Sequence, residues 1–235
     1  MVSAIIVAAG KGVRMKGRMR KQYLDLSGRP VLVHSIMTFD ACSLIEEIVI
    51  VVPEKEIDYC QNNIVSLLDL NTSATLISGG GQRQDSVYNG LQAIDKKTDV
   101  VVIHDGVRPF INTEDLTACI IGARDFGACI LGIPASDTLK RVNKSGIIEG
   151  TLFRENIWLA QTPQAFRYDL IVKAHETARG EGYIGTDDAS LVERLGKDVK
   201  IINGSKFNIK ITTQEDLDVA RAMFDIEAIS EPFSE

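Results

Sequence analysis

Residues 4–15 read Ala4-Ile5-Ile6-Val7-Ala8-Ala9-Gly10-Lys11-Gly12-Val13-Arg14-Met15, an apolar run that passes directly into a glycine-rich, cation-rich turn. The apolar half has the length and β-branched content of a strand buried on both faces. Gly10 and Gly12 allow backbone conformations closed to other residues, so their N–H groups can point into one concavity. Arg14 and Lys21 add positive charge beside it. The pattern predicts a site for the phosphates of a nucleotide.

Neither of the two familiar nucleotide-binding motifs fits this turn. A dinucleotide-binding fingerprint needs a third glycine where the chain has Met15, and a P-loop ends in Gly-Lys-Ser/Thr, which is absent. A tight turn without a ligand is the alternative, but it gives no reason to place Arg14 and Lys21 around it. The cations therefore favour a phosphate site of another type.

Composition narrows the class of ligand. The chain has 235 residues, 45% of them hydrophobic, which is enough for one large α/β domain. Its formal net charge of -6 argues against a nucleic-acid partner, because such proteins need clustered Lys and Arg in excess. No run approaches the ~18 apolar residues of a membrane span, and residues 1–7 lack the basic region of a signal peptide. We therefore expect a cytoplasmic protein with a small anionic ligand and no membrane partner.

Apolar runs and helical patterns alternate through the first part of the chain. Runs typical of parallel-sheet strands lie at residues 4–8, 48–52, 75–77, 100–103 and 128–133. Between them, apolar residues recur at helical spacing at 31–39, 57–68, 87–94 and 116–123. The alternation predicts an α/β fold, Rossmann-like, with an open, twisted, mostly parallel sheet and helices on both faces.

Three loops leave strands of this predicted sheet, at residues 10–21, 79–86 and 104–110. Ligands bind at the carboxyl ends of such strands, so the three loops are expected to converge on one mouth. Asp105 ends a buried strand, and its carboxylate should project toward the phosphate loop. Mg²⁺ is usually held by one or two carboxylates plus substrate phosphates, which makes Asp105 a candidate ligand. An ion pair between Asp105 and Arg108 is the alternative.

The pattern changes after Pro134. Residues 137–142 and 147–152 are predicted to form a β-hairpin around a turn at 143–146. A lone hairpin is unstable in water, so this arm, residues 137–155, should pack on something else. Both a partner subunit and the arm's own domain remain open as the packing surface.

The α/β pattern then resumes, with helices at 168–181 and 187–195 and a strand at 199–202. Thr186 and Asp187 are good capping residues for the second of these helices, which is one explanation for them. A closing helix is introduced by Thr212-Thr213-Gln214-Glu215, a capping-box pattern. We expect a single domain over residues 1–226 and a flexible acidic tail at 227–235.

Seven short motifs follow one another along the chain. They are Ala8-Ala9-Gly10-x-Gly12-x-Arg14-Met15 with Lys21-Gln22-Tyr23, Gly79-Gly80 with Arg83-Gln84-Asp85-Ser86, His104-Asp105-x-x-Arg108-Pro109-Phe110, Asp137-Thr138-Leu139-Lys140, Arg154 with Gln161-Thr162-Pro163-Gln164, Thr186-Asp187-Asp188-Ala189-Ser190, and Asn208-Ile209-Lys210-Ile211-Thr212. In this combination the chain resembles the 2-C-methyl-D-erythritol 4-phosphate cytidylyltransferase family. The resemblance covers about residues 3–224 and is far more specific than any single motif.

The resemblance implies a nucleotidyltransferase fold and a place in the non-mevalonate route to isoprenoid precursors. It implies CTP as donor, a sugar-alcohol phosphate as acceptor, and Mg²⁺ as cofactor, with Mn²⁺ as a substitute. It also implies a homodimer in which the hairpin arm crosses to the partner subunit.

The resemblance further implies roles for individual residues. Contacts to the nucleotide are implied for Ala8, Ala9, Gly10, Gly12, Gly80 and Ser86. Asp105 would hold the metal, and Arg14, Lys21 and Lys210 would be the catalytic cations. Binding of the sugar phosphate is implied for Arg108, Thr138, Arg154, Thr162, Thr186 and Asp187, with Thr138 and Arg154 acting at the partner's site.

The implied reaction needs no side-chain nucleophile. A phosphate monoester has a second pKa near ~6, so at neutral pH it is mostly dianionic and can attack the α-phosphorus of CTP without a general base. Cations must offset the repulsion between the two anions. Three rival functions are a ribitol-5-phosphate cytidylyltransferase, a dinucleotide-dependent oxidoreductase and a non-catalytic nucleotide-binding protein. Met15 disfavours the second, and the cations near Asp105 disfavour the third.

Overall fold

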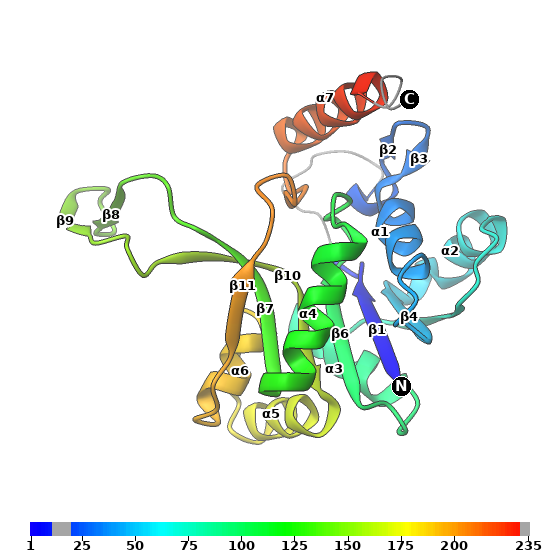
Figure 1. The fold of residues 1–235 in the computed structure, drawn as a ribbon, viewed down its shortest axis with the longest axis horizontal. Helices are drawn as coiled ribbons and strands as arrows, with labels where there is room; N and C mark the ends of the chain where they lie inside the picture. The colour runs from blue at the N-terminus through cyan, green and yellow to red at the C-terminus, as the bar shows by residue number, and fades with distance from the viewer. Residues whose placement is uncertain (11–19, 231–235) are drawn as a thin grey trace.

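The computed structural model describes residues 1–10 and 20–230, with side chains as far as residue 225. Within these ranges, seven strands form one sheet in the order β11-β7-β10-β6-β1-β4-β5 (Figure 1). Their bounds are β1 (Val2–Val7), β4 (Glu47–Val52), β5 (Ser73–Ser78), β6 (Val100–Asp105), β7 (Ala128–Pro134), β10 (Trp158–Arg167) and β11 (Lys200–Asn203). All the predicted strands are present, and the predicted α/β fold with a mostly parallel sheet is confirmed.

One strand of the sheet was not predicted. β10 lies between β6 and β7 and runs antiparallel to both. Its sequence contains Pro163 among polar residues, a pattern that argues against a central strand. The structure accommodates the proline where the register with β7 shifts between Ala160 and Gln164. Such an irregularity is one of the few places in a sheet that tolerate proline, because no ladder hydrogen bond is needed there.

Helices cover both faces of the sheet. Their bounds are α1 (Val31–Asp40), α2 (Ile57–Asn63), α3 (Arg83–Ala93), α4 (Thr113–Phe126), α5 (Tyr168–Gly180), α6 (Asp188–Arg194) and α7 (Gln214–Ser230). The predicted helix at 57–68 is shorter than expected, because the chain leaves helical geometry at Ile64 and continues as a 3-10 turn over Val65–Leu67.

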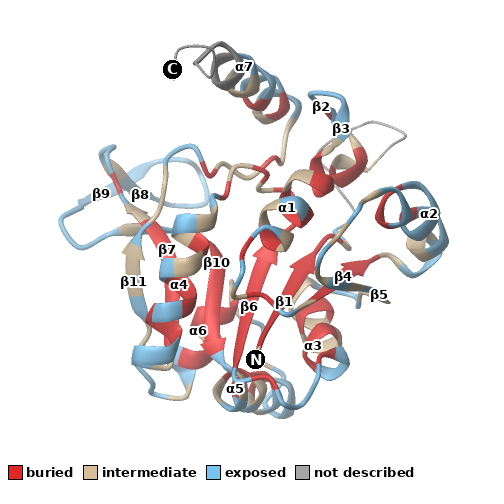
Figure 2. Ribbon diagram, turned by 45° about the vertical axis from the view of Figure 1, so that its right-hand side comes forward, coloured by how far each residue is buried: buried red, intermediate tan, exposed pale blue. Residues whose placement is uncertain are grey.

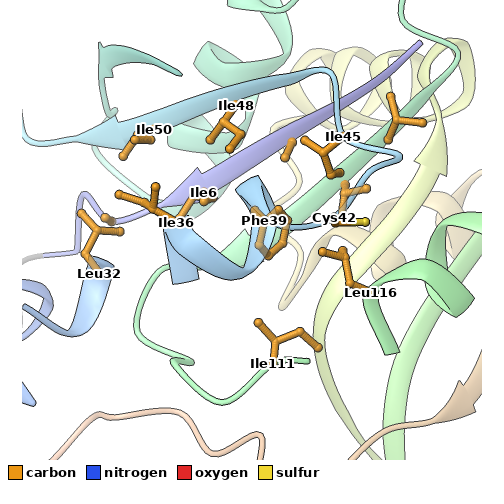
Figure 3. Close-up of a cluster of buried hydrophobic side chains, with 14 of the residues drawn as sticks. Ile6, Leu32, Ile36, Phe39, Cys42, Ile45, Ile48, Ile50, Ile111 and Leu116 are labelled. Carbon is orange, nitrogen blue, oxygen red and sulfur yellow. The ribbon is translucent and has the colours of Figure 1, made fainter. Parts of the chain in front are cut away.

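Alternate residues of the central strands belong to two separate cores. Ile6 and Ile48 point to the face covered by α1 and α4, where they pack with Phe39 and Leu116 (Figure 3). Ile5 and its neighbours of the same parity point to the other face, against α3, α5 and α6. The strands are therefore buried on both sides, as their continuous apolar sequence predicts (Figure 2).

The closing helix α7 packs on the edge of the domain. Leu217 and Ala220 contact Leu26 of the short strand β2 (Asp25–Leu26), which pairs with β3 (Arg29–Pro30). The cap of α7 is one residue later than expected, since Thr213 Oγ1 accepts from the Asp216 backbone N–H at 3.3 Å. The helix extends to Ser230, past the start of the expected tail, and residues 231–235 lie outside the described range.

The predicted hairpin is present as β8 (Leu139–Val142) and β9 (Ile148–Leu152), which form a separate two-stranded sheet. It projects away from the body of the domain (Figure 1). Phe153 at its base is 95% exposed, and Ile147 and Ile148 are also exposed. This arm, residues 137–155, is therefore not packed on its own domain. Across the described ranges, we find no helix with the length and apolar character needed to span a bilayer.

Candidate active site

The loops at the carboxyl edge of the sheet converge on one pocket of about 320 Å³, as predicted. It is bordered by the end of β1, the loop before α3, the end of β6 and the segment before α7, and the lining includes Ala8, Ala9, Gly10, Lys21, Gly80, Arg83, Ser86, Asp105 and Lys210. Gly12 and Arg14 lie outside the described residues. The pocket therefore gathers residues that are more than 200 positions apart in the sequence.

The described part of the glycine-rich loop after β1 is held from two sides. The Ala8 N–H donates to the Val51 carbonyl oxygen at 2.7 Å, which extends the pairing of β1 with β4 by one residue. The buried Gln22 side chain donates to the Ala8 carbonyl oxygen, also at 2.7 Å. Gln22 thus positions this loop, although the sequence motif assigned it no role of its own. Lys21 Nζ donates to the Ile211 carbonyl oxygen at 3.1 Å and so reaches across the pocket.

The loop before α3 is shaped by glycine and serine. A Cβ atom at Gly79 would overlap the Ala9 side chain, so only glycine lets these two loops approach. Ser86 Oγ accepts from the Gly80 N–H at 3.1 Å and donates to the Gln82 carbonyl oxygen at 3.0 Å. The structure brings Gly80 and Ser86 to the pocket as predicted, and Ser86 acts there by holding the loop's backbone.

Asp105 lies at the centre of a group of cations. Arg83 Nε is 2.9 Å from one carboxylate oxygen, Lys210 Nζ is 2.6 Å from the other, and Arg108 Nε is 4.0 Å away. Burial alone would raise the pKa of Asp105, but the charges of Arg83 and Lys210 outweigh it and hold the pKa well below its usual range. The alternative pairing with Arg108 is therefore the weakest of the three contacts.

The donor set fits a metal held jointly with a ligand. Among the described residues no cluster of three or more His, Cys, Asp or Glu side chains could hold an ion by itself. A single ionised carboxylate next to a phosphate site is how Mg²⁺ is usually bound. Both Asp105 oxygens are ion-paired here, and the Lys210 side chain, 37% exposed, is the partner that can move toward phosphates. Asp105 would then hold the metal.

Thr162 lies directly behind Asp105. Its buried hydroxyl accepts from the Asp105 backbone N–H at 3.0 Å and lies 3.1 Å from His104 Nδ1. His104 Nε2 is 3.2 Å from the Arg108 carbonyl oxygen, and a neutral ring protonated on Nε2 satisfies both contacts. Burial lowers the pKa of His104 to about 4, which agrees with that neutral form. Thr162 thus supports the site rather than facing the pocket.

The other residues predicted to bind the sugar phosphate lie at two places, the start of α6 and the arm. Asp187 caps α6, accepting from the Ser190 N–H at 3.0 Å, and its second oxygen accepts from Gln164 at 2.8 Å. Capping therefore accounts for much of Asp187, while Thr186 next to it is exposed. Thr138 and Arg154 lie on the arm, where Arg154 donates to the Ser136 carbonyl oxygen, and they do not line this chain's pocket.

Three residues near the site were not predicted to matter. Arg83 and Asp188 were each part of a motif without a role of their own, and His175 lies in the predicted helix at 168–181. In the structure Arg83 Nη1 is 2.7 Å from Asp188 Oδ2, and His175 Nε2 is 3.1 Å from Asp188 Oδ1. His175 and Asp188 are almost completely buried. Arg83 is the first residue of α3, and nothing in its local sequence indicates that its side chain will pair with the buried Asp188.

Comparisons with known proteins agree on one family. The family model for 2-C-methyl-D-erythritol 4-phosphate cytidylyltransferase matches residues 2–225. A protein of that name from Pelotomaculum thermopropionicum is 48% identical over 222 residues, covering 94% of this chain and 93% of the relative. One from Caldanaerobacter subterraneus is 45% identical over 219 residues, covering 93% and 96%.

Solved structures are similar over nearly the whole chain. The crystal structure of 4-diphosphocytidyl-2C-methyl-D-erythritol synthase from Anaerococcus prevotii has a TM-score of 0.85 at 34% identity, covering 95% of this chain and 96% of that one. A 2-C-methyl-D-erythritol 4-phosphate cytidylyltransferase from Francisella tularensis has a TM-score of 0.80 at 32% identity, covering 94% and 98%.

Proposed function

The chain belongs to the 2-C-methyl-D-erythritol 4-phosphate cytidylyltransferase family, and we propose that it joins CTP and 2-C-methyl-D-erythritol 4-phosphate. The products are 4-diphosphocytidyl-2-C-methyl-D-erythritol and pyrophosphate. The observation that carries this proposal is the pocket in which Arg83 and Lys210 surround Asp105 beside the loop that ends β1. That pocket combines a cation-rich surface with one ionised carboxylate, as a nucleoside triphosphate and its metal require.

The chemistry is a displacement at phosphorus. An oxygen of the sugar-alcohol phosphate attacks the α-phosphorus of CTP, the bond from that phosphorus to the bridging oxygen breaks, and pyrophosphate leaves. The dianionic phosphate needs no general base. Lys21 and Lys210, which border the pocket, would stabilise the charge that builds up on the phosphate oxygens, and Arg14 is proposed for the same role.

A divalent ion, Mg²⁺ or Mn²⁺, would neutralise phosphate charge when bound. Asp105 would hold it, and Lys210 would then exchange its contact with Asp105 for one with the phosphates. Arg108 is proposed to contact the sugar phosphate. Its Nη1 donates to the Asn208 carbonyl oxygen at 2.6 Å, and this hydrogen bond holds the guanidinium near Asp105.

Selection of cytosine is proposed for backbone groups of the loops around Ala8 and Gly80. These loops are held in place by Gln22 and Ser86, so their donors and acceptors cannot rearrange freely to suit uracil. Each group left unpaired by the wrong base costs ~1 to 3 kcal/mol.

We also propose a homodimer formed through the arm. Its apolar side chains Ile147, Ile148 and Phe153 are 64%, 59% and 95% exposed in the single chain. Exposed apolar groups on a projecting hairpin are typical of an interaction surface. In such a dimer Thr138 and Arg154 would reach the partner's pocket, since they have no access to their own.

The test is pyrophosphate release with each substrate pair in turn. We expect turnover with CTP and 2-C-methyl-D-erythritol 4-phosphate, and far lower rates when ribitol 5-phosphate replaces the acceptor or UTP replaces CTP. Faster turnover with ribitol 5-phosphate would reassign the acceptor. Equal rates with UTP would contradict the proposed selection of cytosine, and no release with any pair would contradict the enzymatic function.

A further inference from the structure

A chain of polar contacts runs from the pocket into the second core. Starting from Asp105, it passes to Arg83 at 2.9 Å, to Asp188 at 2.7 Å and to His175 at 3.1 Å. The four residues come from β6, α3, α6 and α5, so this series of contacts links the pocket to three helices on one face of the sheet. Of these four residues, the proposed reaction gives a role only to Asp105.

Arg83 is held in a fixed orientation by two carboxylates. Its Nε faces Asp105 and its Nη1 faces Asp188, and a planar guanidinium that meets two fixed acceptors cannot rotate without losing one of them. Asp188 is 1% exposed, and its other oxygen is engaged by the fully buried His175. Burying a carboxylate is costly unless it is paired, so Asp188 depends on both partners.

The geometry has a direct consequence for Asp105. Because Arg83 occupies Oδ1, the other oxygen, Oδ2, is the one that meets Lys210 at 2.6 Å on the pocket side. We propose that Arg83, clamped by Asp188 and His175, is a positioning residue that sets the direction in which Asp105 presents Oδ2 to Lys210 and to the divalent ion that would accompany the phosphates. This inference rests on the proposed function, because it assigns the clamp to the same pocket.

An ion pair that only stabilises the fold is the competing explanation, and the two differ in what Asp188→Asn does to the folded protein. The substitution removes the charge that balances Arg83 and leaves the guanidinium to Asp105 alone. We expect kcat to fall roughly tenfold to hundredfold, the range typical when residues supporting a site are changed, with much smaller changes in KM. Glu181→Gln is the matched control: it removes the same charge from an exposed pair with Arg194 at the end of α5 and should leave kcat unchanged.

A second readout does not require turnover. In protein without nucleotide, the ¹⁵N–¹H signal of the Arg83 Nε–H, assigned by its loss in Arg83→Lys, should shift in Asp188→Asn and stay in place in Glu181→Gln. If wild-type protein releases no pyrophosphate, the proposed function fails while this signal still tests the clamp. An unmoved signal in Asp188→Asn overturns the clamp whatever the activity.

The remaining variants cover the case in which Asp188→Asn does not fold. Arg83→Lys keeps the charge but cannot span two carboxylates, so a folded Arg83→Lys protein should lose kcat as well. His175→Gln retains a donor for Asp188 and should keep more activity than His175→Phe. Wild-type kcat in a folded Asp188→Asn or Arg83→Lys protein overturns the proposal, as does a raised KM for CTP with unchanged kcat. Failure of both variants to fold would make the clamp a purely structural feature and would overturn it too.

Discussion

Gly106 follows Asp105 at the point where β6 enters the pocket, and alanine at this position tests how closely the site is packed. A Cβ atom there would lie 2.8 Å from Leu32 Cδ1 and 3.0 Å from Ile6 Cγ2, whereas ordinary contact begins at 3.4 Å. The neighbours must therefore retreat by up to about 0.6 Å. Leu32 can move the end of its side chain, but Ile6 is β-branched and fixed in the central strand β1, so part of the displacement falls on the backbone that carries Asp105.

We expect Gly106→Ala to lower the free energy of unfolding by about 1–3 kcal/mol, the usual cost of overpacking a core. A displacement of 1 Å can cost a hundredfold in rate, so a shift of about half that size should lower kcat/KM roughly tenfold. Urea unfolding monitored by circular dichroism gives the first quantity, and pyrophosphate release gives the second.

A double-mutant cycle with Leu32→Val isolates the clash. Valine lacks the Cδ1 atom that the new methyl group meets, so the two substitutions together should cost less than the sum of their separate effects. Gly180→Ala is the control, because a Cβ atom at Gly180 meets nothing within 4 Å. Additive costs in the cycle, or a Gly106→Ala protein with wild-type stability and kcat/KM, would refute the packing argument.

Three further predictions follow from the site and the arm. Lys21→Ala should lower kcat by roughly 10²–10³ while the circular dichroism spectrum stays native, and near-normal turnover would contradict its role. Because the pKa of His104 is lowered to about 4, the unfolded chain binds a proton between about pH 6.5 and pH 4 that the folded protein does not, so stability should fall by about 2 kcal/mol from pH 7 to pH 5. In urea unfolding at the two pH values, His104→Gln should show a smaller fall than wild type; an identical fall would disprove the assignment. Light scattering should give a dimer for wild type and a monomer for the double variant Ile148→Ser/Phe153→Ser, and an unchanged mass would count against the arm as the interface.

Much of the fold could be predicted because it depends on local patterns. β1 and β6 contain apolar runs rich in β-branched residues, which suit a sheet covered on both faces, and the helical spacing between them fixes the order of the elements. Asp105 was found for the same reason, since it follows directly on such a run. β10 was missed because Pro163 and its polar neighbours lack that local signature, and only pairing with β6 and β7 makes the segment a strand.

That the loops following β1, β5 and β6 meet at the carboxyl edge of the sheet was evident from the amino-acid sequence, because strand direction and loop position follow from apolar periodicity. How the side chains on these loops pair with one another depends on three-dimensional packing. Arg83 and Asp188 are separated by 105 positions, and their contact depends on how α3 and α6 pack on the same face of the sheet. Periodicity places each helix on that face, but the distance between two side chains is set by packing in three dimensions, which no local pattern encodes.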